Sequence, residues 1–156
     1  MAGKEHHYVA HVAWTGNTGE GTASYKAYER AHVISAPGKT DIAGSSDKNF
    51  RGDASRWNPE DLLVASASTC HMLWYLHLCA VNGVVVLDYR DQAEGVMLEE
   101  ANGSGAFSRI VLKPQVKLSA ASSEARAHEL HHEAHAMCFI ANSIKCEIAV
   151  EPAFSR

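Results

Sequence analysis

A long apolar segment with defined ends constrains this chain more than any other feature. Residues 62–81 are mostly apolar, and they lie between Asn58-Pro59-Glu60-Asp61 and Asn82-Gly83. Asparagine is a good N-cap, proline fits the first helical position, and two carboxylates suit the positive end of the helix dipole. Glycine commonly ends helices. The sequence therefore predicts one helix over residues 58–81. Its apolar side chains lie nearly all round it, so we expect it to be buried on most faces.

This helix is long enough to cross a bilayer, but polar side chains interrupt it. They are Ser66, Ser68, Thr69, His71 and His77. We therefore expect a core helix and no membrane partner. The polar stretch Met1–Tyr8 contains no apolar region of the kind found in secretion signals, which favours a cytoplasmic location.

The length of 156 residues suits a single domain over residues 1–156. The net charge is -4, and the sequence contains no block rich in Lys and Arg. Because phosphate binding needs clustered positive charge, we do not expect nucleic acid as a partner.

Alternating and β-branched segments flank the long helix. The predicted strands are Tyr8–Trp14, Thr22–Ile34, Lys39–Ala43, Val84–Leu98, Phe107–Leu118 and Cys146–Phe154. A polar loop over residues 44–57 leads into the first helix. Ser122 or Ser123 caps a second helix that runs to about Met137, with a shorter helical continuation through Ile144. The order βββ-α-ββ-α-β predicts an α+β fold.

Four cysteines are too few and too scattered for a disulfide scaffold. In a reducing compartment they are usually buried apolar residues, metal ligands or redox catalysts. Cys70 lies among small polar residues of the first helix, so it could face a pocket or be an inert buried thiol. Cys79, nine residues later, points to the opposite side of the helix, and we expect it in the core. Cys146 alternates with Ile148 and Val150, which also indicates a core position.

Cys138 follows a histidine-rich segment. If the helix breaks near Met137 and restarts, Cys138 lies at a helix N-terminus, where backbone N–H groups lower a thiol pKa. The alternative is a cysteine packed in the core.

The histidines of this segment share one helix face, and they are His128, His131, His132 and His135. His131 and His135 together with Cys138 could bind zinc. The spacing matches no zinc motif, however, so a solvated polar face is the preferred interpretation and no metal is expected.

Glu60 is ten residues before Cys70, which is roughly 15 Å along an unbroken helix. It cannot touch the Cys70 thiol of its own chain directly. A role for Glu60 at that thiol therefore needs a partner subunit or a relay, and this geometry favours a dimer.

Two motifs resemble the OsmC/Ohr family of organic hydroperoxide reductases. One is Asn58-Pro59-Glu60-Asp61-Leu62-Leu63 with Cys70 ten residues after the glutamate, and the other is the segment 134–143 around Cys138. Arg51-Gly52-Asp53 and Cys70-His71-Met72-Leu73 look closest to an OsmC-like branch. The resemblance covers nearly the whole chain. It implies two central helices with curved antiparallel sheets, in an intertwined homodimer with active sites at the subunit interface.

The resemblance also implies a two-cysteine peroxidase without a metal or organic cofactor. Cys70 would be the peroxidatic thiolate, Cys138 the resolving thiol, and Glu60 a polarising group. Its substrates would be organic hydroperoxides, and could extend to hydrogen peroxide, with an external dithiol as reductant.

The resemblance further implies an arginine in the turn after the first strand, but residues 15–21 contain none. Arg51 is the best substitute, followed by Arg30 and then Arg56. The missing arginine motivates an alternative, a redox or ligand-binding protein of this fold without efficient peroxidase turnover.

Overall fold

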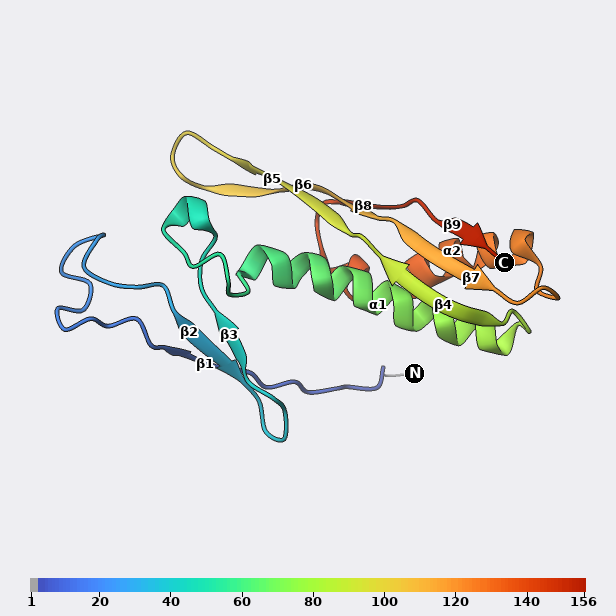
Figure 1. Cartoon of the computed structure of the whole chain (residues 1–156), viewed down its shortest axis with the longest axis horizontal. Coiled ribbons are helices and arrows are strands. Elements are labelled where there is room, and N and C mark those ends of the chain that lie inside the picture. Colours follow the sequence, from blue (N-terminus) through green and yellow to red (C-terminus); the bar gives the residue numbers. More distant parts are fainter. Residues whose placement is uncertain (1–2) are drawn as a thin grey trace. The chain divides into compact units, whose positions relative to one another are not determined.

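The computed structural model describes residues 3–156, and Figure 1 shows the elements in chain order. The first half contains β1 (His11–Trp14), β2 (His32–Ser35), β3 (Ile42–Gly44), the short 3-10 helix η1 (Lys48–Phe50) and α1 (Pro59–Val81). The second half contains β4 (Val86–Asp91), β5 (Glu94–Glu99), β6 (Gly105–Leu112), β7 (Pro114–Leu118), α2 (Glu124–Met137), η2 (Ala141–Ser143), β8 (Glu147–Val150) and β9 (Ala153–Ser155). The predicted α+β class is confirmed.

The long helix begins and ends where the sequence predicts. The Asn58 side chain accepts a hydrogen bond from the backbone N–H of Asp61 at 2.8 Å, and α1 ends at Val81. Gly83 follows with a φ of 71°, a left-handed conformation that glycine adopts without steric cost.

The expectation that α1 is buried on most faces is wrong. Its buried residues form one stripe at four-residue spacing: Ala67, His71, Tyr75 and Cys79. The reason is that the core packs against one side of the helix only, and Leu73 on another side is 63% exposed. By length and composition alone α1 could cross a membrane, a property that it shares with core helices of soluble proteins.

The chain divides into two compact units, residues 1–62 and 63–156, and α1 begins in the first and continues through the second. The single-domain assignment of residues 1–156 stays a prediction. In the first unit β1, β2 and β3 form an antiparallel sheet.

The predicted strand Thr22–Ile34 is wrong in its first ten residues. The strand there starts only at His32, because side chains hold the preceding segment in turns. Asn17 accepts hydrogen bonds from the N–H groups of Gly19 and Gly21, at 2.9 and 3.0 Å. The Arg30 guanidinium donates to the carbonyl groups of Tyr25 and Tyr28.

The second unit contains two three-stranded sheets, ordered β4-β7-β9 and β5-β6-β8. Each of the three later predicted strands is therefore two strands, divided where the chain passes from one sheet to the other. Asp91 stabilises one such crossing, since its carboxylate accepts a hydrogen bond from the N–H of Lys113 at 2.7 Å. The pairs β6–β8 and β7–β9 run parallel, so the sheets are mixed rather than wholly antiparallel.

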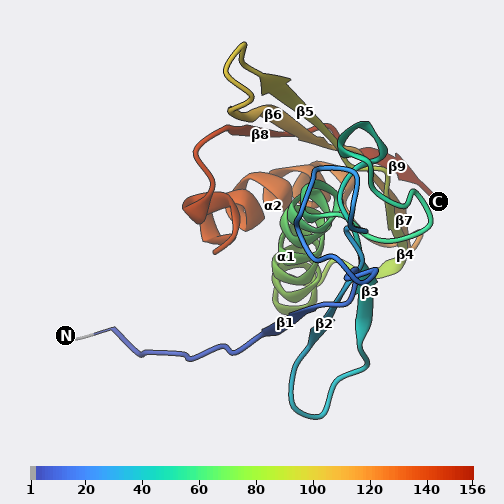
Figure 2. The ribbon, with the colours of Figure 1, turned by 90° about the vertical axis from the view of Figure 1, so that its left-hand side faces the viewer.

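The second helix, α2, starts at its predicted cap, where the Ser123 side chain accepts a hydrogen bond from the N–H of Arg126. Figure 2 shows α2 beside α1 within the second unit. One core cluster joins α1 and α2 to β7 and includes Tyr75, Val116 and Leu130. A second cluster joins α1 to β6 and β8.

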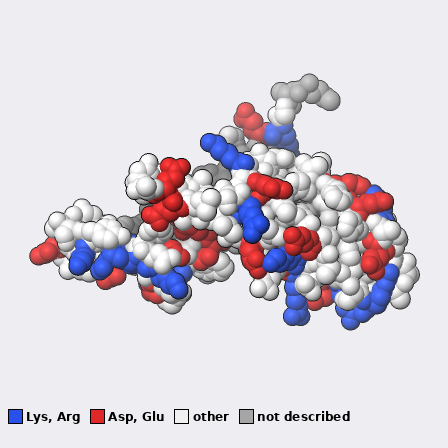
Figure 3. Space-filling view, turned by 90° about the horizontal axis from the view of Figure 1, so that it is seen from above, with Lys and Arg blue, Asp and Glu red and all other residues white. Residues whose placement is uncertain are grey.

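Acidic and basic side chains are interspersed over the face seen in Figure 3, in keeping with the net charge of -4. The ion pairs of the described residues include Lys113–Glu94 and Arg126–Glu133, each at 2.7 Å. The exclusion of nucleic acid as a partner stays a prediction.

Candidate active site

The second unit brings Cys70 and Cys138 together. Cys70 comes from the middle of α1, and Cys138 is the residue directly after α2. The Cys70 thiol lies close enough to Cys138 to contribute to raising the pKa of the Cys138 thiol. Both are free thiols in this structure. Two sulfur atoms 68 positions apart in the sequence (138 minus 70) therefore share one site.

The two thiols differ in their access to solvent. Cys70 is half-buried, whereas Cys138 is buried, with 1% of its surface exposed. Burial raises the pKa of the Cys138 thiol to about 11. The backbone N–H of Ala141, which donates to the sulfur at 3.4 Å, acts in the opposite direction, but its effect is smaller. Of the two alternatives for Cys138, the cysteine packed in the core therefore matches the structure, because desolvation of the thiolate outweighs the N–H groups of the short turn that follows.

A pocket of about 390 Å³ opens beside Cys70. Besides this thiol it is lined by Leu73, Trp74 and His77 of α1 and by Phe139. The rings pack edge to face, with centroids 5.6 Å apart between Trp74 and Phe139 and 5.9 Å apart between Trp74 and His77. The volume lies in the range of small-molecule sites, and most of the lining is hydrocarbon, as such sites usually are.

The other two cysteines lie outside this pair. Cys79 is buried in the core cluster of α1, α2 and β7, as predicted, and burial raises the pKa of its thiol. Cys146 precedes β8 and packs against the second core cluster, where it is half-buried.

The charged residues of the predicted site belong to the first unit or to its border. Glu60 lies in the first turn of α1. Arg51 is exposed and has a φ of 63°, a conformation that is costly for a residue with a side chain. Arg56 pairs with Asp53 at 3.6 Å, and the Arg30 guanidinium is held by backbone carbonyl groups and lies over two tyrosine rings.

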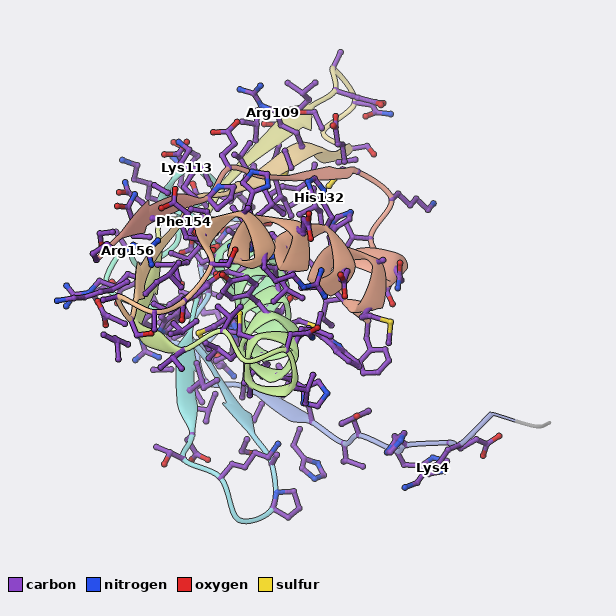
Figure 4. The ribbon with its side chains drawn as sticks, turned by 90° about the vertical axis from the view of Figure 1, so that its right-hand side faces the viewer. Lys4, Arg109, Lys113, His132, Phe154 and Arg156 are labelled. Carbon is purple, nitrogen blue, oxygen red and sulfur yellow. The ribbon has the colours of Figure 1, made fainter. Side chains whose placement is uncertain are left out.

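The histidine-rich face of α2 is only partly solvated. His128 and His132 are exposed, and Figure 4 shows His132 on α2. Phe154 packs against His128 and His131. His131 is 2% exposed, so its predicted place on a solvated face is wrong. The phase of the helix explains this, because His131 follows the core residue Leu130 and points toward α1.

The buried His131 forms a pair with His71 of α1. Nδ1 of His131 lies 3.0 Å from Nε2 of His71, and the Tyr75 ring stacks on His131 with centroids 3.7 Å apart. Burial, reinforced by neighbouring histidines, lowers the pKa of His71 to about 4 and that of His131 to about 3. Both imidazoles are therefore neutral near pH 7, and one donates its N–H to the other.

Metal binding by this segment finds no geometric support. Among residues 3–156, no group of three or more His, Cys, Asp or Glu side chains is arranged to hold a metal ion. Nδ1 of His131 is hydrogen-bonded to His71. The zinc alternative built on His131, His135 and Cys138 therefore does not match the structure.

One known protein family matches this chain over more than half of its length. The sequence profile described as "OsmC-like protein" matches residues 52–153, which include both α1 and α2. The chain belongs to the OsmC-like family. The resemblance identified from the two cysteine motifs is thereby confirmed.

Individual relatives of this OsmC-like chain extend the comparison to nearly its whole length. It is 30% identical to an OsmC-like protein of unknown function from Vibrio cholerae, with a TM-score of 0.87 over 96% of this chain and 100% of the other. It is 23% identical over 150 residues to the uncharacterized protein YmaD of Bacillus subtilis (strain 168), covering 94% of this chain and 92% of YmaD.

A more distant relative shares the fold. The organic hydroperoxide resistance protein OsmC of Legionella pneumophila is 16% identical, with a TM-score of 0.67 over 97% of this chain and 100% of that protein.

Sequence reasoning found both cysteines of the site but missed part of its surroundings. It did not single out His77 or Phe139 as pocket lining. The seven-residue spacing of Cys70 and His77 is the signal that could have placed His77 on the same side of the helix.

Proposed function

We propose that this chain is a thiol-dependent peroxidase that reduces organic hydroperoxides, with hydrogen peroxide as a possible further substrate. The observation that carries the proposal is the pairing of a half-buried thiol, Cys70, with a buried thiol, Cys138, at the edge of an apolar pocket. A hydroperoxide in the pocket meets Cys70 first, and Cys138 is shielded until Cys70 has reacted.

In the first step the Cys70 thiolate attacks the distal oxygen of ROOH. The O–O bond breaks, an S–O bond forms, and the alcohol ROH leaves after taking up a proton, so that Cys70 becomes a sulfenic acid. In the second step the Cys138 sulfur attacks the Cys70 sulfur. The S–O bond breaks, water leaves, and the Cys70–Cys138 disulfide remains. An external dithiol then reduces this disulfide by exchange and is itself oxidised.

The high pKa of Cys138 fits the resolving role better than the peroxidatic one. A thiol held neutral at pH 7 reacts slowly with peroxide, since the thiolate is the nucleophile. Next to a sulfenic acid, the same thiol needs only to transfer its proton as the disulfide forms. Its burial keeps it from competing for the substrate.

Arg51 and Glu60 complete the proposal as groups that polarise Cys70 from the partner subunit of a homodimer. Glu60 is ten residues from Cys70 on the same helix, too far for direct contact within the chain. Of the three candidate arginines, Arg51 is the exposed one, and it has no carboxylate partner among the ion pairs of residues 3–156. A cytoplasmic location, where dithiol reductants are abundant, belongs to the same proposal.

Similarity supports the reaction class. A solved relative of the same fold is described as an organic hydroperoxide resistance protein. The apolar walls of the pocket favour an organic group on the substrate over the bare hydrogen peroxide molecule.

The test is consumption of an organic hydroperoxide in the presence of excess dithiol. Cys70→Ser should abolish consumption, while Cys146→Ser, a matched change at another half-buried cysteine, should retain it. Full activity in Cys70→Ser would eliminate the mechanism. Loss in both variants would point to general damage, which thermal unfolding of the two proteins would reveal.

One observation favours a second function. The turn at residues 15–21 contains no arginine, so a group expected to activate the thiol is missing from its usual position. In a redox or ligand-binding protein, the hydroperoxide would oxidise Cys70 only slowly, and the oxidised protein would not be recycled by dithiol. The rate of Cys70 oxidation under single-turnover conditions distinguishes the two functions.

A further inference from the structure

A second cavity lies between α2 and β8 in the second unit. Its volume is about 140 Å³, which is small beside the roughly 300–1,000 Å³ of most small-molecule sites. The helix contributes imidazoles and the strand contributes aliphatic side chains. The lining includes His128, His131, His132 and His135 of α2 and Ile148 and Val150 of β8. None of these residues lines the pocket beside Cys70, so the two cavities are separate.

His131 presents to this cavity a nitrogen that no other group uses. The side chain is 2% exposed, and its Nδ1 is hydrogen-bonded to His71. The other ring nitrogen, Nε2, is buried and has no hydrogen-bond partner among residues 3–156. The Tyr75 ring stacks on His131 and holds the plane of the imidazole. Because buried polar atoms in native proteins nearly always have a partner, Nε2 indicates a binding partner in the cavity.

The hydrogen bond between His71 and His131 determines which group His131 offers to that partner. Both imidazoles are neutral near pH 7, so each has one N–H, and Nδ1 of His71 is also buried without a partner in the described chain. If His71 donates from Nε2, its unpartnered atom is only a lone pair, and the proton of His131 is on Nε2 beside the cavity. The opposite arrangement leaves an unpaired N–H in the core, which is rarer than an unpaired acceptor. His131 therefore offers a donor, and its partner is an acceptor.

The surroundings of the cavity admit a negatively charged acceptor. Among the described residues, no Asp or Glu side chain lines it. Glu129 and Glu133 of α2 pair with Arg126, at 3.1 and 2.7 Å. Glu147 and Glu151 are exposed and alternate in sequence with the aliphatic lining residues, which places them on the other face of the strand. An anion in the cavity therefore meets N–H donors on one side and hydrocarbon on the other.

We propose that this cavity binds a short aliphatic carboxylate. Its oxygens accept hydrogen bonds from Nε2 of His131 and from His135, whose Nδ1 is also buried and unpartnered within residues 3–156. Its alkyl group packs on Ile148 and Val150, which a bare inorganic anion would leave uncovered. Hydrogen bonds to a charged oxygen are the stronger kind, which favours a carboxylate over a neutral amide. The site involves neither Cys70 nor Cys138, so it does not depend on the proposed peroxidase function.

The first experiment titrates the ¹⁵N-labelled full chain with isobutyrate at pH 7 and follows the imidazole signals by NMR. EDTA is present throughout, so that a carboxylate held through a metal ion gives no signal. The His131 and His135 signals should shift and saturate, and free His131 should have its proton on Nε2. Isobutyramide, of the same shape without the charge, and inorganic phosphate should each bind at least about tenfold more weakly.

Three results of this titration would overturn the proposal. No saturable shift with isobutyrate would mean that water alone satisfies the buried nitrogens. Equal affinity for isobutyramide would contradict recognition of the charge. Equal affinity for phosphate would contradict a role for the aliphatic wall.

The second experiment repeats the titration with variants. His131→Phe and His135→Phe should each weaken isobutyrate binding by about tenfold, because each removes one hydrogen bond to a charged group. His11→Phe, the same change at an exposed histidine of β1, is the control and should bind as the wild type does. Circular dichroism checks the fold, and His135→Phe, at a half-buried position, decides the question where His131→Phe does not fold. Wild-type affinity in folded His135→Phe would refute the proposed contacts.

Discussion

Two neighbouring residues of α1, Cys70 and His71, face opposite environments. Cys70 borders an open apolar pocket and meets a second thiol, while His71 is 1% exposed and meets a second imidazole. The difference arises from helix geometry, since adjacent side chains point about 100° apart. One helix thus supplies an accessible reactive face and a sealed structural face, and residues of the same type on the two faces should behave differently.

The largest expected effect is a difference in peroxide turnover between a variant of Cys138, the partner of Cys70, and a variant of Cys79 on the sealed face of α1. Cys138→Ser should stop peroxide consumption after about one equivalent and leave Cys70 as a sulfenic or further oxidised acid, because no resolving thiol remains. Mass spectrometry of the Cys70 peptide measures this state. Cys79→Ser, on the sealed face, should still cycle with dithiol. Continued cycling in Cys138→Ser would show that the second thiol is dispensable.

The sealed face should govern stability in acid. Folding lowers the pKa of His71 to about 4 and of His131 to about 3 from an ordinary value of 6.5, so below pH 6.5 the unfolded chain binds protons that the folded chain does not. The stability that depends on the neutral forms of His71 and His131 is therefore fully present above pH 6.5 and is lost as the pH falls toward about 4. The loss should be on the order of 3 kcal/mol in the free energy of unfolding for each of the two histidines.

Urea unfolding at a series of pH values measures this loss. The double variant His71→Phe with His131→Phe should lose less stability than the wild type between pH 6.5 and 4. A control with His128→Phe and His132→Phe, two exposed histidines, should follow the wild type. Carboxylates titrate in all three proteins, so their contribution cancels in the comparison. Equal acid sensitivity of the buried-pair variant and the wild type would contradict the assignment.

The smallest expected effect tests whether the reactive face is open. Leu73 is 63% exposed at the pocket, so Leu73→Ala should change the free energy of unfolding by less than about 0.5 kcal/mol. Chemical denaturation measures this change. A loss of several kcal/mol would mean that the partner subunit of the proposed homodimer covers Leu73 as well as reaching Cys70.

The ends of the two helices could be predicted from the sequence, but the division of the strands between the sheets could not. Asn58 and Ser123 as caps define the starts of α1 and α2, and Val81 and Met137 end them as expected, because caps and breakers act within a few residues. The strands were drawn too long, since their division depends on which strand pairs with which. Asp91, which holds Lys113 where β6 passes into β7, gives no such signal in the sequence.

The candidate site shows the same division. Cys70 and Cys138 were identified from motifs, and Cys79 was placed in the core from helical phase alone. The burial of His131 was missed because a run of histidines resembles a solvated face until α1 packs against it. The sequence left open whether Cys138 is packed in the core with a raised pKa, because desolvation depends on the whole surrounding core.

The most direct measurement is a thiol count with peptide mapping, before and after one equivalent of an organic hydroperoxide. The account predicts that two of the four thiols disappear and that the linked peptides contain Cys70 and Cys138. Four thiols remaining after treatment, or a disulfide that joins Cys79 or Cys146 instead, would contradict it.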